Sequence, residues 1–518
     1  MGTAGALVYC TRRLQASRSG SGLALARGNA IQCKQEARSD ARRDSLVAAA
    51  RNPELEQQII AAPDDVQAYL VYGDWLQARG DPRGALIAAQ HALLDDPESP
   101  PLRETERLLI EEHARELGGP TLDVEPAPQM RWQLGFWRAL RCGSFGWSAK
   151  PWHDEHVQAL LEHDSARFVR ELAADGLFTG AVLATVGDKH QTLRSLDVAL
   201  RAGEQFDDDS LAPLRACTRL RRLALFSCDA VTDRGMQVLR ALDELEQIDL
   251  RNHPLSDAGV ACLSAAPLQE VFFNELARGF SSAGMAGLAR LPLRKLDLSC
   301  GPSIGDEHLR QLAGHATIDD LALPGAGFGE QGARALATLA LARLYVPSSA
   351  IGDAGVAQLP RCLRSVDLGH CRLSDAACAA LACMADLEQL RLDGSAGVTG
   401  GGVRQLAALG RLRTLCLGFC ELDDQDIEPL GDLESIETLG LAFNNLTEAS
   451  VDMLARMPRL HTLDLASCAL SEDAIDRLAR SASLRYVGLY SCPSEAIARA
   501  EGVDGWSVYR RDTLELMD

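Results

Sequence analysis

The sequence predicts an α/β fold: a right-handed solenoid curved like a horseshoe, with parallel strands inside and helices outside, preceded by a small helical module. Three observations predict it. A short apolar phrase recurs along the chain, the step between its copies is nearly constant, and a helix-start signal follows several copies. One strand and one helix cannot bury their apolar faces alone, so the copies must stack to form a continuous core.

The recurring phrase is Leu-x-x-Leu-x-Leu. Its thirteen copies are separated by twelve steps that cover 291 residues, which is about 24 residues a step. Within the phrase, apolar and polar residues alternate, as in Leu463-Asp464-Leu465, and this is the period of a β-strand. The copies begin at Leu193, Leu220, Leu245, Leu268, Leu293, Ile318, Leu341, Leu363, Leu387, Leu412, Ile436, Leu460 and Leu484.

A helix-start signal follows the strand phrase after about eight residues. A Ser or Thr stands next to an acidic residue at Thr232, Ser256, Ser374 and Ser471. The hydroxyl can accept hydrogen bonds from the unpaired N–H groups of the first helical turn, and the acid suits the positive end of the helix dipole. The sequence therefore predicts one short helix after each strand.

A cysteine recurs three residues after the last apolar residue of the phrase. It is found at Cys228, Cys371, Cys420, Cys468 and Cys492, with Asn444 in the same place. With this residue the array over 191–492 resembles the cysteine-containing and ribonuclease-inhibitor-like subclasses of leucine-rich repeat. The resemblance implies that this side chain turns inward and donates to backbone carbonyls where the strand bends away. Ala326, Ser349 and Ser395 occupy the position in other copies.

The cysteine content favours reduced thiols. The chain has 15 cysteines, an odd number, and many stand in repeat phase, whereas disulfide frameworks are typical of small secreted chains with paired spacing. We therefore predict buried, reduced thiols and a cytoplasmic protein. Cys362, Cys371, Cys378 and Cys383 lack the Cys-x-x-Cys element of structural zinc sites, so no metal or other cofactor is predicted.

The charge is strongly acidic. The net charge is −20, and because residues 1–44 contribute +5, the remainder carries −25. This argues against nucleic acid and against an anionic membrane surface, since both need clustered Lys and Arg. It suits a basic protein or peptide, although solubility alone also explains an acidic array. No apolar run reaches the length of about 18 residues that a membrane span requires.

The first 44 residues are rich in Arg and Ser and poor in acids. Such a composition resembles an organelle transit peptide, and a start codon assigned too early would also explain it. We predict a disordered basic segment over 1–44.

A separate helical module is predicted over 45–117. Tyr69, Tyr72 and Leu76 have helical spacing, and Gly80-Asp81-Pro82 indicates a C′ glycine, an N-cap and a proline at the first helical position. The text Pro63-Asp64 … Gly73-Asp74-Trp75-Leu76 … Gly80-Asp81-Pro82-Arg83-Gly84 resembles a bacterial repeat-companion domain, which usually has Ala where Gly73 stands and carries no established activity. Pro53-Glu54-Leu55 followed by Trp75 loosely resembles an F-box, the adaptor of ubiquitin-ligase receptors.

Residues 118–190 are predicted to be a linker and the N-terminal cap of the solenoid, and 493–518 the C-terminal cap. The cap is indicated by a cluster of aromatic residues, Trp132, Trp137, Trp147 and Trp152, because the open end of a solenoid needs an atypical covering segment. A ligand pocket among these aromatics is the alternative, and His153, His156 and His163 lie near the spacing of metal ligands.

The chain shows no phosphate-binding loop, nucleophile elbow or zinc-protease motif. We therefore predict a non-enzymatic, monomeric scaffold that binds a protein or peptide through its concave face. A ubiquitin-ligase substrate receptor, or an enzyme with its site in 120–190, remain alternatives. Aromatic residues among acids resemble the composition of an interface. The predicted partner-binding residues are Phe226, Phe272, Tyr345, Asp367, Phe419, Phe443, Asp464, Tyr486 and Tyr490.

Overall fold

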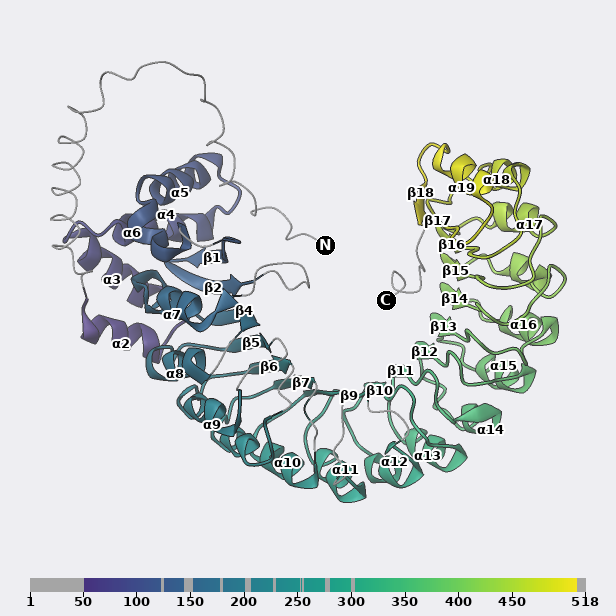
Figure 1. The fold of residues 1–518 in the computed structure, drawn as a ribbon, viewed down its shortest axis with the longest axis horizontal. Coiled ribbons are helices and arrows are strands. Elements are labelled where there is room, and N and C mark those ends of the chain that lie inside the picture. The colour runs from purple at the N-terminus through teal and green to yellow at the C-terminus, as the bar shows by residue number, and fades with distance from the viewer. Residues whose placement is uncertain are drawn as a thin grey trace, which may run out of the picture.

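A computed structural model describes most of the chain from Arg51 to Tyr509. The described ranges are 51–122, 125–143, 152–177, 180–200, 206–226, 230–251, 253, 256–274, 280–299 and 303–509. The predictions made for 1–44, Trp147 and Cys228 lie outside these residues. Within them the chain forms a horseshoe whose strands line the inside and whose helices cover the outside (Figure 1), so the predicted α/β solenoid is confirmed.

The strands of the described residues form one sheet of 18 members, in which each strand pairs with the next along the chain, except that β2 and β3 both pair with β4. They are β1 (Gln129–Gln133), β2 (Phe136–Cys142), β3 (Trp152–His153), β4 (Glu171–Leu177), β5 (Ser195–Leu200), β6 (Arg222–Phe226), β7 (Gln247–Arg251), β8 (Glu270–Phe273), β9 (Lys295–Leu298), β10 (Asp320–Ala322), β11 (Arg343–Tyr345), β12 (Ser365–Asp367), β13 (Gln389–Arg391), β14 (Thr414–Cys416), β15 (Thr438–Gly440), β16 (Thr462–Asp464), β17 (Tyr486–Gly488) and β18 (Ser507–Tyr509).

The helices alternate with the strands along the outside of the curve. The α-helices are α2 (Pro53–Ala61), α3 (Val66–Gln77), α4 (Pro82–Asp95), α5 (Pro100–Glu112), α6 (Ala114–Gly118), α7 (Asp154–Glu162), α8 (Gly180–Lys189), α9 (Asp208–Leu211), α10 (Asp257–Cys262), α11 (Ser282–Leu288), α12 (Asp306–Leu312), α13 (Glu330–Leu336), α14 (Gly352–Val356), α15 (Asp375–Leu381), α16 (Gly400–Leu406), α17 (Val451–Arg456), α18 (Glu472–Leu478) and α19 (Ser494–Glu501). Short 3₁₀ segments are η1 (Gly119–Leu122), η2 (Asp164–Ala166), η3 (Ala212–Ala216), η4 (Gly235–Ala241), η5 (Leu263–Ala265) and η7 (Glu428–Asp432).

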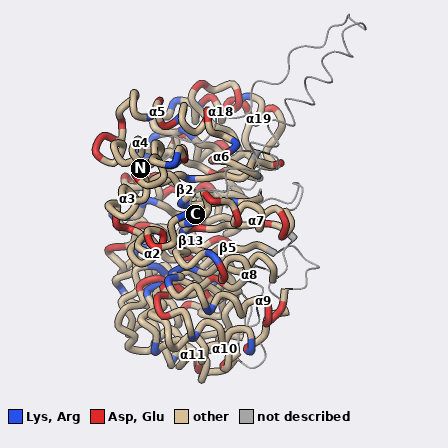
Figure 2. Tube along the Cα trace, turned by 90° about the vertical axis from the view of Figure 1, so that its left-hand side faces the viewer, with Lys and Arg blue, Asp and Glu red and all other residues tan. Residues whose placement is uncertain are grey.

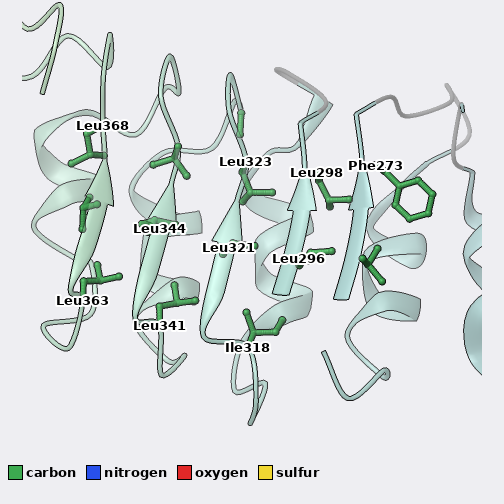
Figure 3. Close-up of a cluster of buried hydrophobic side chains, with 14 of the residues drawn as sticks. Phe273, Leu296, Leu298, Ile318, Leu321, Leu323, Leu341, Leu344, Leu363 and Leu368 are labelled. Carbon is green, nitrogen blue, oxygen red and sulfur yellow. The ribbon is translucent and has the colours of Figure 1, made fainter. Parts of the chain in front are cut away.

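The apolar residues of the phrase form the core, as predicted. In β16, Leu463 is fully buried and lies in register with Leu439 of β15 and Val487 of β17. The same relation repeats from strand to strand, so that successive leucines point away from the inner surface and stack in rows (Figure 3). One continuous apolar cluster therefore runs from Trp137 to Ala500.

The parallel ladder extends beyond the thirteen copies at both ends. β4 pairs with β5 with Leu172 opposite Leu196, and β2 pairs with β4 with Leu140 opposite Leu172. At the other end, Val508 of β18 lies opposite Val487. The ladder thus begins inside the segment 118–190, where β1 closes it as an antiparallel hairpin with β2.

The predicted helix caps occur, and at Asp233, Asp257 and Asp375 the acid beside the cap has a second role. Ser256 and Ser374 accept hydrogen bonds from the first turns of α10 and α15, whereas Thr232 precedes the 3₁₀ segment η4. The acid that follows one cap binds the cap of the next repeat: Asp375 accepts from Thr399 N and Oγ1 at 2.8 and 2.7 Å. These carboxylates therefore tie each repeat to its neighbour.

The helical module packs directly against the first strands. Its second apolar cluster joins Tyr72 of α3 to Phe136 of β2 and to Phe168, with the Tyr72 and Phe136 rings stacked at 6.0 Å. The predicted turn between α3 and α4 is also present, with Gly80 at φ +75° and Asp81 as the N-cap.

Polar contacts reinforce this packing. Buried Glu56 pairs with Arg167 at 3.1 Å and accepts a hydrogen bond from the Tyr72 hydroxyl at 2.9 Å. The Asp64 carboxylate bridges Arg170 and Arg194 at 2.5 and 2.6 Å. The module and the solenoid end are therefore joined through both apolar and charged contacts.

Candidate functional site

The inner face of the sheet presents two columns of side chains. Each short strand has a buried central residue, and the residues before and after it point the other way because strand side chains alternate. In β16 these are Thr462 in the upstream column and Asp464 in the downstream column. Of the predicted residues, Tyr486 lies in the upstream column, and the downstream column contains Phe272, Tyr345, Asp367 and Asp464.

The half of the inner face built by the earlier strands is occupied by paired charges. Asp320 pairs with Lys295 at 3.6 Å and with Arg343 at 2.8 Å, and Arg222 lies 4.0 Å from Asp197. Basic and acidic residues are interspersed over the solenoid (Figure 2). Pairs whose cation is exposed add little stability each, and the alternating charges leave no uniform field on this half.

The later strands present a different surface. Thr414, Thr438 and Thr462 fill the upstream column of β14–β16. The downstream column has Cys416 and Gly440, which are in such close register that a Cβ built on Gly440 would lie 3.3 Å from Cys416 Sγ. This stretch of the inner face is therefore uncharged until Asp464.

Aromatic side chains stand along the edge of this uncharged stretch. Phe419 and Phe443 lie in what we call the rim column, the residue two places after the last leucine of each phrase, just past β14 and β15. Their rings stack with centroids 4.2 Å apart and planes 10° apart, and Phe419 is 39% exposed. We call this pair the aromatic rim.

The rim column has a left-handed backbone. Phe419 and Phe443 both have φ +56°, and each donates its N–H to a carbonyl of the next repeat, to Ala442 O at 2.9 Å and to Ala466 O at 2.8 Å. Other repeats fill the column mostly with small residues, which accept this conformation at lower cost. They are Gly325, Ser348, His370, Gly394, Ser467 and Ser491.

Carboxylates lie on both sides of the aromatic rim: Asp367 and Asp393 precede it along the chain, and Asp464 follows it. Asp393 follows β13, is 4% exposed and accepts from Gly418 N at 2.8 Å; burial raises its pKa. Arg391 lies between Asp367 and Asp393, with its Nε 3.4 and 3.5 Å from their carboxylate oxygens. The group thus has more negative than positive charge.

Asp464 differs from the prediction. We expected an accessible acid on the concave surface, but it is only 2% exposed and accepts from Ala466 N at 3.0 Å. An Asp in the downstream column can bind the backbone N–H two residues on, as Asp367 also does with Gly369 at 2.8 Å. Its side chain therefore serves the turn that leads to the rim.

The remaining predicted residues fall into two groups. Tyr486 and Tyr490 are 44% and 45% exposed in the repeat of β17, two repeats after Phe443, so these two residues together with Phe419 and Phe443 belong to three repeats. Tyr345 is 44% exposed on β11. Half-buried Phe226 and Phe272 lie among the paired charges of the earlier strands, with Lys295 Nζ 5.2 Å from the Phe272 ring centroid.

The recurring cysteine turns inward, as the resemblance implied. Cys371 and Cys420 are 5% and 1% exposed, and their Sγ atoms donate to Val346 O at 3.2 Å and Leu392 O at 3.4 Å. Asn444 binds more strongly at the same position, because it donates to two carbonyls and accepts from two backbone N–H groups.

The cap region offers no assembled metal site among the described residues. His163 stacks on Trp137 with centroids 5.1 Å apart, and burial lowers its pKa to about 4. Trp137 and Trp152 are buried in the core, 0% and 2% exposed. In the part of the chain that the structure describes, no helix is both long and apolar enough to cross a bilayer.

Comparisons with known proteins agree with this geometry. A family model for the leucine-rich repeat matches residues 360–382, which contain β12 and α15. No curated protein has a significant sequence match. The repeated strand and helix and the continuous leucine core define a leucine-rich-repeat solenoid fold, and the family model matches one of its repeats.

Solved structures with a similar fold are distant. The Rad7–Elc1 complex of yeast is 17% identical, over 70% of this chain and 84% of that chain, with a TM-score of 0.43. An internalin, InlF of Listeria monocytogenes, is 16% identical over 72% and 94%, with a TM-score of 0.39. A leucine-rich-repeat protein of Leptospira interrogans is 15% identical over 76% and 98%, with a TM-score of 0.42.

Proposed function

We propose that this protein is a non-enzymatic scaffold that binds a protein or peptide on the C-terminal half of its concave face. The observation that carries the proposal is the aromatic rim. A bulky ring in a left-handed backbone is strained, and serine and glycine fill the same column elsewhere. The fold therefore does not require Phe419 and Phe443, and exposed clusters of large apolar side chains tend to mark interaction sites.

The surroundings support the same half of the face. Tyr486 and Tyr490 add exposed rings two repeats further on, and aromatic residues are enriched where interfaces hold most of their binding energy. The earlier strands instead carry charges paired with one another. Charges at the border of an interface act more on the rate of encounter than on affinity. We place Tyr345, Phe226, Phe272 and Asp367 at the periphery of the proposed contact.

The proposal includes a partner of basic character, no cofactor and a monomeric scaffold. The net charge of −20 favours a basic partner. A chain with no catalytic motif and a rim of aromatic residues is better suited to recognition than to chemistry.

The test is affinity capture from the native cell with mass spectrometry, using the full chain and two variants. Phe419→Ser/Phe443→Ser should lose the partner that the unchanged chain recovers, by about 2 kcal/mol or more in affinity if both are hot spots. Leu108→Ser is the matched control, because Leu108 is 41% exposed on α5 of the helical module. A partner retained equally by the double variant would contradict the proposal, and capture of a ligase adaptor through the module would favour the receptor alternative.

A further inference from the structure

We propose that the aromatic rim receives an arginine side chain of the partner, with the guanidinium lying against an outer face of the stacked Phe419–Phe443 pair and attracted by the buried carboxylates of the neighbouring repeats. This inference rests on the proposed function and names the chemistry that the site would select. It follows from three features: a continuous ring surface, carboxylates on both sides of it, and an uncharged floor.

The ring surface is longer than the two phenylalanines. His370 is exposed in the same rim column, and its ring centroid lies 6.4 Å from that of Phe419. The repeat between them has Gly394, and a Cβ built there would lie 2.1 Å from His370 Nδ1. The missing side chain therefore lets the His370 ring lean across one repeat toward Phe419, and three rings form one shelf.

The carboxylates flank this shelf in the order of the strands. Asp393 follows β13, Phe419 follows β14, Phe443 follows β15, and Asp464 ends β16. Neighbouring strands are about 4.8 Å apart, so each phenylalanine has a carboxylate one repeat away. With Asp367 and one guanidinium, Arg391, the local charge of these four side chains is −2. These carboxylates are largely buried, and buried charges are less screened by salt than exposed ones.

The floor, by which we mean the inner face of β14 and β15 beside the three rings, is uncharged. Thr414, Thr438, Cys416 and Gly440 line the inner face of β14 and β15, so the described residues place no fixed cation on this stretch of the inner face. A planar guanidinium stacks on aromatic faces and is weakly hydrated, and buried carboxylates attract it without direct contact. An ammonium is more strongly hydrated, and a neutral side chain would gain nothing from the flanking charge.

The experiment is ¹⁹F NMR of the full chain with 4-fluorophenylalanine at all 12 Phe positions. The signals of the rim are assigned with Phe419→Leu and Phe443→Leu. The probes are three heptapeptides, acetyl-Gly-Ser-X-Gly-X-Ser-Gly-amide, in which X is arginine, lysine or citrulline. Citrulline has the shape of arginine without its charge.

The arginine peptide should shift the Phe419 and Phe443 signals saturably and bind about fivefold more tightly than the lysine peptide, the scale of an exposed cation–π contact. The citrulline peptide should leave both signals in place. The Phe328 signal, assigned with Phe328→Leu, is the internal control, because Phe328 is fully buried in the core. In Asp393→Asn the arginine preference should fall, since one flanking charge is removed while the Gly418 contact can persist.

Equal shifts with citrulline would overturn the arginine assignment, because shape alone would then account for binding. No shift with any peptide would also overturn the arginine assignment. If Phe419→Ser/Phe443→Ser still loses the captured partner, the proposed binding function of the concave face stands without the arginine assignment. A chain ending at Tyr509 that binds the arginine peptide when the full chain does not would assign the rim to Arg510 and Arg511 of this chain, and so overturn the external partner.

Discussion

Phe419 and Phe443 stack face to face across two adjacent repeats, with ring centroids 4.2 Å apart, and both have a left-handed backbone with φ +56°. The stacking and the strain arise from one repeat-to-repeat relation. Phe419 and Phe443 each donate their backbone N–H to a carbonyl of the following repeat. This bond fixes the same backbone conformation in both repeats, so the two rings occupy equivalent positions and can stack. The hydrogen-bond ladder therefore sets the geometry of the shelf, and the side chains can change without loss of the ladder.

The rim variant should remain folded. Ser467 and Ser491 occupy the same column with φ +58° and +60°, so serine fits the backbone that Phe419 and Phe443 have. The double change to serine loses one aromatic pair, about 0.5–1.5 kcal/mol, and some partly buried surface. We expect urea unfolding to show a loss of about 1–2 kcal/mol. A much larger loss would show that the rings support the core.

Leu463→Ala should be more costly than the change at the rim. Leu463 is fully buried between Leu439 and Val487, and deleting such a side chain costs about 2–5 kcal/mol. Thr462→Ala is the matched control in the same strand, since a half-exposed inner-face position typically changes stability by about 0.5 kcal/mol or less. A loss below about 1 kcal/mol at Leu463 would contradict the core assignment.

The core could be predicted from the sequence because its signal is local and repeated. Leu463 and its equivalents alternate with polar residues inside each copy. The flanking strands escaped detection because their copies are atypical: Val169-x-x-Leu172-x-Ala174 and Trp137-x-x-Leu140-x-Cys142 occupy the same register with other apolar residues.

The site was predicted less fully, because its geometry depends on contacts between repeats. An aspartate in Leu-Asp-Leu points to the inner face. Its carboxylate can either remain available to a partner or accept a hydrogen bond from the backbone N–H two residues later. Asp464 does the second, since it accepts from Ala466 N. No pattern in one copy reveals the left-handed rim, since Gly394, Phe419 and Ser467 share one backbone. Likewise, the sequence predicts that Asp375 interacts with the dipole of its own helix, whereas in the structure it also accepts a hydrogen bond from Thr399 of the next repeat.

The inward cysteines should resist labelling in the folded protein. Cys371, Cys420 and Cys468 are buried, and burial raises the pKa of Cys420 and of Cys468 to about 12. At pH 8 a neutral alkylating reagent should miss all three, because thiolate is the reactive form, and should modify them after unfolding in urea. Cys362 and Cys383 are exposed and provide the reactive control. Rapid native modification of Cys420, or a mass showing a disulfide, would contradict the assignment.

The contact between module and solenoid should depend on Arg167. Removing it by Arg167→Met leaves buried Glu56 without one of its cations, and breaking a buried pair costs about 3 kcal/mol. Urea unfolding should show this loss. Arg107→Met is the control, because Arg107 pairs with Glu104 and Glu111 on the surface of α5 and its change should leave the unfolding midpoint where it is. Equal effects of the two changes would show that the buried network does not hold the module.

Acid should weaken the fold through buried His190. This side chain is 1% exposed, and burial lowers its pKa from 6.5 to about 4. Between these values the unfolded chain binds a proton that the folded chain does not, so stability is unaffected by His190 above pH 6.5 and falls as the pH decreases toward 4. At pH 4.5 the loss of unfolding free energy due to His190 amounts to about 2.5 kcal/mol.

The variant His190→Gln cannot take up this proton. We therefore expect urea unfolding at pH 7.5 and 4.5 to show a larger acid loss in the unchanged chain than in the variant, by about that amount. His163, with its pKa also lowered to about 4 by burial, and the carboxylates titrate in both proteins and cancel in the comparison. Identical losses in the two proteins would mean that His190 accepts a proton in the folded state.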